Sequence, residues 1–198
     1  MPVFDQAIAF LIFSLAAAIT PGPSNVMITA AGSTLGLVRG IPCVLGTSLG
    51  MALLLFCAAL GLGQLVLGHP AMLRAMNWGG ATVLLWLAWR IATARPMPAA
   101  AARPVGLLGA ALFQWINPKG WLVAIAAAGT FLPAHGDDRI AQAALFGALF
   151  FAAAFPSGLV WLLLGALMHR WLRDARIARL CNVVMGAALA ASVAMILW

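Results

Sequence analysis

The sequence predicts an all-α integral membrane protein, with six transmembrane helices arranged as two inverted three-helix repeats. Hydrophobic residues make up 65% of the 198-residue chain and charged residues only 8%, so the mean hydropathy reaches +1.06. Several apolar runs exceed the roughly 20 residues that a helix needs to cross a bilayer, and short connections carry most of the charges. A soluble domain of this size has no use for so apolar a surface.

Six apolar segments predict the six helices, at about 3–31, 42–67, 71–94, 106–132, 140–169 and 180–198. The first run lacks the positive leading region of a signal peptide and carries Asp5, so we expect it in the mature protein. The longest connection, 95–105, is rich in proline and alanine and predicts a semi-stiff linker. We therefore expect one transmembrane domain over 1–198, with repeats at about 1–94 and 106–198.

The arginines predict the orientation in the membrane. Connections after the first, third and fifth helices share one side, which holds eight of them: Arg39, Arg90, Arg95, Arg103, Arg170, Arg173, Arg176 and Arg179. The other side holds only Arg74 and Arg139. The positive-inside rule places the arginine-rich side and the linker in the cytoplasm, and both termini outside. Because the net charge of +7 sits at segment ends, it indicates membrane orientation and not nucleic-acid binding.

The first segment contains a helix break at Thr20-Pro21-Gly22-Pro23-Ser24-Asn25. Two prolines around a glycine cannot continue a regular helix, because proline has no backbone N–H. We expect the Thr20 and Ser24 side chains to cap the helix that follows. A simple proline kink, which membrane helices tolerate, is the alternative interpretation.

The fourth segment contains a second break, at Asn117-Pro118-Lys119. Asparagine followed by proline is typical of a helix start, so a new helix is predicted in mid-segment. A lysine at that depth costs about 2.5–3.5 kcal/mol on insertion scales, which favours a functional role. A lysine reaching the membrane surface is one alternative, but that surface is about 15 Å away. A lysine that stays neutral until it meets an anion is another.

Together the two breaks predict a substrate site. Pro21 and Pro118 are separated by about half the chain, and three crossings per half give the halves opposite orientations, as in many secondary transporters. Two half-helix N-termini near the midplane, with Lys119, would suit a carboxylate, and the nearby polar side chains would suit an ammonium group. Each polar residue alone is more often an interhelical hydrogen bond. The predicted binding residues are Pro21, Gly22, Pro23, Ser24, Asn25, Gln114, Asn117, Pro118 and Lys119.

Other patterns argue against an enzyme or a metal site. Gly46-Thr47-Ser48-Leu49-Gly50 fits the G-x-S-x-G pattern of hydrolases, but it lies inside a membrane segment with no histidine or acid at similar depth. We predict that Gly46 and Gly50 serve helix packing. The spacing of the three cysteines fits neither a metal site nor a disulfide, so no metal or cofactor is expected. Trp115 and Trp121 flank the second break. We expect both side chains to serve packing, and lining the predicted site is the alternative role.

The motifs T-P-G-P-S-N and Q-W-I-N-P-K resemble the paired signatures of the LysE-type amino-acid exporter family. Within it, W-G-G-A at 78–81 and W-L-A-W-R-I-A-T at 86–93 look most like the cysteine/O-acetylserine exporter branch. The resemblance implies a multi-pass carrier of the bacterial inner membrane that exports amino acids or close derivatives, driven by the proton gradient. By motif, it places function on residues of both breaks.

The chain departs from the family pattern at Ser24 or Asn25, where many members carry an acidic residue. All four acids here, Asp5, Asp137, Asp138 and Asp174, lie near segment ends, which leaves Lys119 or the substrate to carry a coupled proton. Two alternatives stay open: a channel or facilitator for another small solute, and a non-transporting structural membrane subunit. Glycine faces permit a homodimer without requiring one.

Overall fold

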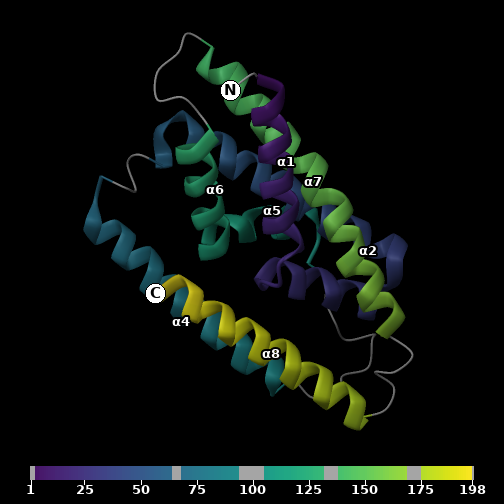
Figure 1. Cartoon of the computed structure of the whole chain (residues 1–198). Helices are drawn as coiled ribbons and strands as arrows, with labels where there is room; N and C mark the ends of the chain where they lie inside the picture. The colour runs from purple at the N-terminus through teal and green to yellow at the C-terminus, as the bar shows by residue number, and fades with distance from the viewer. Residues whose placement is uncertain (1–2, 64–67, 94–104, 132–137, 169–174, 198) are drawn as a thin grey trace.

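The computed structural model describes residues 3–63, 68–93, 105–131, 138–168 and 175–197, and within these ranges all regular structure is helical (Figure 1). The predicted all-α class is confirmed. The predicted linker lies almost wholly outside the described residues, as do Arg95, Arg103, Asp137, Arg170, Arg173 and Asp174. The elements are α1 (Val3–Ile19), α2 (Pro23–Cys57), the π-helix η1 (Ala58–Leu62), α4 (Pro70–Ala92), α5 (Leu107–Ile116), α6 (Pro118–Phe131), α7 (Arg139–Met168) and α8 (Ala175–Leu197).

Both predicted helix breaks are present. The first separates α1 from α2, and Gly22 between them is extended, with φ −176° and ψ 177°. The second separates α5 from α6, and Asn117 leaves the helical region with φ −85° and ψ 110°. Each new helix begins with a proline, Pro23 or Pro118, because the first turn of a helix does not need that residue's N–H.

The connection predicted between residues 31 and 42 is much shorter than expected. Helical structure continues from Pro23 to Cys57, and a single residue, Gly36, interrupts it with φ 76° and ψ −175°. A side chain at that φ would clash with the backbone, so glycine allows the chain to change direction within one residue. Gly36 divides α2 into a first half, 23–35, and a second half, 37–57.

Small residues let α2 pack closely on its neighbours. It lies along both α7 and α5, while α1 packs on α7 and α4 on α8 (Figure 1). A Cβ at Gly50 would lie 2.6 Å from the Ala111 carbonyl oxygen of α5, and one at Gly46 would overlap the Leu107 carbonyl. Gly32 meets the backbone of α7 in the same way. Gly32, Gly46 and Gly50 thus pack against helices of their own chain.

Two stretches among the described residues are long and apolar enough to cross a membrane, Pro23–Leu62 and Arg139–Met168. Asp5–Ile19 and Leu107–Ile116 are shorter apolar helices. The outer surface is also apolar, since Trp78, Trp89 and Leu108 are at least 65% exposed. The arrangement of six crossings in two repeats stays a prediction.

Segments predicted to share one side of the membrane meet at one end of the bundle. The Gln6 side-chain amide donates to the Phe131 carbonyl, which joins the start of α1 to the end of α6. Arg139 Nε donates to the Ala59 carbonyl over 3.1 Å, which joins the start of α7 to η1. Each of the two bonds joins a pair of helix ends that are far apart in sequence.

Candidate functional site

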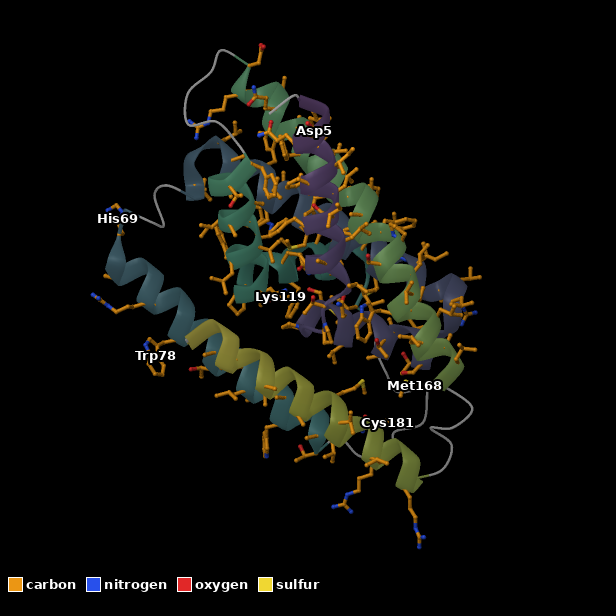
Figure 2. All side chains as sticks on the ribbon, in the orientation of Figure 1. Asp5, His69, Trp78, Lys119, Met168 and Cys181 are labelled. Atoms are coloured by element: carbon orange, nitrogen blue, oxygen red, sulfur yellow. The ribbon has the colours of Figure 1, made fainter. Side chains whose placement is uncertain are left out.

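The two helix breaks face each other inside the bundle, and Lys119, at the start of α6, lies between them (Figure 2). Side chains from one break reach groups of the other. The two breaks are therefore in direct contact, and their joint use as a substrate site stays a prediction.

A chain of hydrogen bonds joins the breaks through three side chains. Ser24 Oγ donates to Gln114 Oε1 over 2.9 Å, and Asn117 Nδ2 donates to Ser24 Oγ over the same distance. Asn117 Nδ2 also approaches Gln114 Oε1 at 3.3 Å, while Gln114 Nε2 donates to the Ala110 carbonyl at 3.1 Å. Gln114 is 0% exposed and Asn117 4%. Because all three side chains have partners, the network is stable when the site is empty.

The two new helices are capped differently from each other. Asn117 Oδ1 accepts a hydrogen bond from the Lys119 backbone N–H at 3.2 Å, which confirms the predicted side-chain cap of α6. The prediction that Thr20 and Ser24 cap α2 is wrong. The residue at the cap position is Gly22, Thr20 Oγ1 donates back to the Ala16 carbonyl, and the Ser24 hydroxyl is used by Gln114.

The interruption of the helix at Gly22 leaves carbonyl oxygens at and just beyond the end of α1 without their usual helical donors. Asn25 Nδ2 donates to the Ala18 and Thr20 carbonyls, each at 2.9 Å. Lys119 Nζ donates to the Thr20 carbonyl at 2.6 Å and to the Pro21 carbonyl at 3.3 Å. The lysine thus places a cation at the C-terminal end of α1, where the helix dipole favours positive charge.

Gly22 packs directly against the Lys119 side chain. A Cβ at Gly22 would be 2.8 Å from Lys119 Cδ and 3.1 Å from Nζ. The absence of a side chain lets Lys119 cross the first break and reach the carbonyls beyond it. This gives Gly22 a specific role that does not depend on its backbone angles, since an extended residue need not be glycine.

A pocket of about 480 Å³, counting the space at its open mouth, lies beside the network. Six of the nine predicted binding residues line it: Gly22, Ser24, Asn25, Gln114, Asn117 and Lys119. Pro21, Pro23 and Pro118 shape the backbone and are not among the lining residues. The rest of the wall is mainly apolar, with Met51 of α2 and Phe150 of α7 among its members, and no carboxylate lines it.

One polar lining residue, Thr47, was not predicted. It stands next to Gly46 in the stretch interpreted as helix packing, and its signal in the sequence is a hydroxyl, with that of Ser48 beside it, in the mainly apolar stretch 40–57. Trp115 and Trp121 do not line the pocket. Trp121 Nε1 donates to the Trp115 carbonyl at 2.9 Å, and both rings pack against the core around Phe10 and Phe146, as the packing interpretation expected.

Metal-binding side chains do not gather anywhere in the described part of the chain, where no three histidines, cysteines or acids could share an ion. Cys43, Cys57 and Cys181 are free thiols. What the site offers a ligand is one cation, backbone dipoles, amides and hydroxyls beside an apolar wall.

Comparison with known proteins points to transport. A family model described as LysE type translocator matches residues 15–197. Curated relatives described as cysteine/O-acetylserine efflux protein are 36% identical over 129 residues in Salmonella typhimurium, 36% over 126 in Klebsiella pneumoniae and 31% over 126 in Escherichia coli. Each alignment covers 63% of this chain and 64% of the relative, which is less than two thirds of either. No solved structure matches the chain.

Proposed function

Because the chain belongs to the family of LysE type translocators, we propose that it exports small amino acids or close derivatives from the bacterial cytoplasm. The observation that carries the proposal is the hydrogen-bonded contact of two broken helices, with Lys119, beside a pocket. Broken helices that meet at a polar site are the usual way in which secondary transporters bind charged solutes.

A zwitterion suits the charges of the site. Its carboxylate would take Lys119 Nζ and the N-terminal ends of α2 and α6, where helix dipoles favour negative charge. Its ammonium group would replace Lys119 on the Thr20 and Pro21 carbonyls. Binding then replaces the contact between Lys119 and the two carbonyls with two contacts to the substrate, one to its carboxylate and one to its ammonium group. A solute with a single charge cannot make both contacts.

The substrate that we propose is a small neutral amino acid of the cysteine or O-acetylserine type. Relatives described by those two substrates are 31–36% identical to this chain over the aligned region. The apolar wall beside the network leaves room for a short side chain and offers no carboxylate to a cationic one.

We further propose the two inverted repeats and alternating access by rocking of one against the other. Part of the helix packing supports this, because these contacts are preserved when the halves are exchanged: α1 packs on α7 as α5 packs on α2, and α4 pairs with α8. The arginine asymmetry supports an inner-membrane orientation with both termini outside. Coupling to the proton gradient belongs to the proposal, with Lys119 or the substrate carrying the proton.

The experiment measures efflux of labelled amino acids from preloaded proteoliposomes. The panel contains cysteine, O-acetylserine, threonine, homoserine, lysine and leucine. We expect saturable efflux of a few neutral members, lost in Lys119→Ala and retained in the matched control Arg74→Ala, which removes an exposed cation of α4.

Three results would contradict parts of the proposal. Undiminished efflux in Lys119→Ala would remove the role given to the lysine. Flux that fails to saturate would indicate a channel. A folded wild-type protein that releases none of the six amino acids would contradict amino-acid export itself.

A further inference from the structure

Thr47 carries a hydroxyl that the protein itself does not satisfy. The residue is 8% exposed and lines the pocket, and its Oγ1 has no hydrogen bond of ordinary geometry among the described residues. A threonine inside a helix usually donates to the carbonyl four residues earlier, as Thr29 does to Asn25 at 2.8 Å. Thr47 does not, and the Cys43 thiol that faces it one turn earlier is only a weak hydrogen-bonding group.

The remaining polar side chains at the breaks already have partners. Ser24, Gln114 and Asn117 bond to one another, while Asn25 and Lys119 bond to carbonyls of the first break. The Trp161 indole nitrogen is the other buried polar atom found without a partner in the described residues, and Trp161 does not line the pocket. Thr47 is therefore the polar lining group that has only a weak partner, the Cys43 thiol, and a ligand can offer its hydroxyl a stronger one.

Thr47 also lies apart along the chain from the groups that suit a zwitterion. It comes from the second half of α2, next to the apolar wall of Met51 and Phe150, whereas the charged and amide groups come from the two breaks. A ligand held at the breaks by its carboxylate and ammonium groups would direct its side chain toward that wall.

We propose that Thr47 determines specificity by hydrogen bonding to the side chain of the exported amino acid. The inference rests on the proposed function and deepens it. The hydroxyl selects a side chain with a thiol, hydroxyl or ester group over a hydrocarbon of similar size, because an apolar side chain leaves the buried hydroxyl unpaired.

The test compares cysteine with 2-aminobutyrate, which carries a methyl group in place of the thiol, in efflux from proteoliposomes. Thr47→Val removes the hydroxyl and keeps the shape, and Thr47→Ser keeps the hydroxyl. We expect Thr47→Val to lower the kcat/KM ratio of cysteine to 2-aminobutyrate about 3- to 10-fold, and Thr47→Ser to preserve it. The matched control is Thr82→Val on α4, whose exposed hydroxyl bonds only within its own helix, to the Trp78 carbonyl, and the ratio should not change.

A second measurement separates specificity from folding. Since Thr47 makes no ordinary hydrogen bond in the empty protein, Thr47→Val should leave the Tm of the purified protein unchanged or raise it. The inference would be overturned if Thr47→Val left the kcat/KM ratio of cysteine to 2-aminobutyrate unchanged. It would also be overturned if the variant had a lower Tm and lost efflux of both amino acids equally. Either result would leave the proposed function standing. A wild-type protein that exports neither amino acid would overturn the proposed function, and this inference with it.

Discussion

At the scale of single residues, the contact between Lys119 and the first break explains how an apolar segment accommodates a charge. The chain leaves the helical conformation at Gly22, so the carbonyl oxygens just before it, including those of Thr20 and Pro21, have no helical donors. The lysine donates to two of them and sits at the favourable end of the helix dipole. The proline break and the lysine are thus complementary parts of one arrangement.

Replacing Gly22 with alanine tests that arrangement. The new Cβ would overlap Lys119 Cδ, and the flexible lysine side chain would move off the Thr20 and Pro21 carbonyls. We expect efflux to fall about 10-fold, the equivalent of about 1.4 kcal/mol, while the amount of protein in the membrane stays near that of the wild type. Gly129→Ala on α6, where a Cβ meets nothing within 4 Å, is the control. Full efflux in Gly22→Ala would show that the lysine contact is dispensable.

The Ser24–Gln114–Asn117 network makes a separate prediction about stability. Gln114→Leu removes the acceptor of two buried donors, and each unpaired donor costs about 1–3 kcal/mol. We expect a lower Tm, and we expect the double variant Ser24→Ala/Gln114→Leu to lose less than the sum of the single variants, because one unpaired donor is gone. Strict additivity in thermal unfolding of the purified protein would contradict the network.

How far these residues could be predicted depends on the range of the interaction. The helix breaks at Pro21 and Pro118 could be predicted, because the missing N–H of proline acts locally. Lys119 could be identified as a candidate site residue, because the cost of a buried charge depends on its own segment. The capping roles of Thr20 and Ser24 were predicted wrongly, and Thr47 was missed. The Thr20 hydroxyl turns back to the Ala16 carbonyl of its own helix, a local alternative to capping. The Ser24 hydroxyl is oriented by Gln114, which comes close only when the helices pack, and sequence spacing does not reveal that contact.

At the scale of helices, α2 owes its position to glycines on two faces. Gly46 and Gly50 bring its second half against the α5 backbone, and Gly32 brings its first half against α7. Gly36 sets the direction between the halves. The glycine spacing predicted close packing. It did not identify the partner helices, which depend on tertiary contacts. It also did not predict the one-residue turn at Gly36, because a glycine permits a positive φ without requiring one.

Gly46→Ala tests the packing of α2 on α5. Its Cβ would meet the carbonyl of Leu107, a backbone atom that cannot move without moving the helix. Overpacking of this kind costs about 1–3 kcal/mol, so the Tm of the purified protein should fall by several degrees. Gly79→Ala, on the exposed surface of α4 with nothing within 4 Å of the added atom, should leave the Tm unchanged or raise it. Equal Tm values for the two variants would argue against close packing at Gly46.

At the scale of the whole molecule, hydrogen bonds gather helix ends in agreement with the predicted sidedness. Gln6 with Phe131, and Arg139 with Ala59, lie at one end, which the arginine distribution assigns to the outside. The helical class and two long apolar spans could be predicted from composition and run length. The packing partners could not, since apolar segments of similar composition satisfy many pairings.

Cysteine labelling tests the orientation. In a variant without Cys43, Cys57 and Cys181, Asp138→Cys should react with a membrane-impermeant maleimide in intact cells, and Arg39→Cys should react only after permeabilisation. Asp138 and Arg39 are both exposed. The reverse pattern would invert the predicted topology.

A carrier that releases its cargo must also reset without it. In the proposed cycle, the Lys119 ammonium group takes the place of the departed amino group on the Thr20 and Pro21 carbonyls. After release, the Thr20 and Pro21 carbonyls are therefore already paired with the Lys119 ammonium group. The empty protein needs no second solute to pair with them while it returns to its starting conformation. An internal surrogate of this kind favours one-way export over obligatory exchange of one amino acid for another.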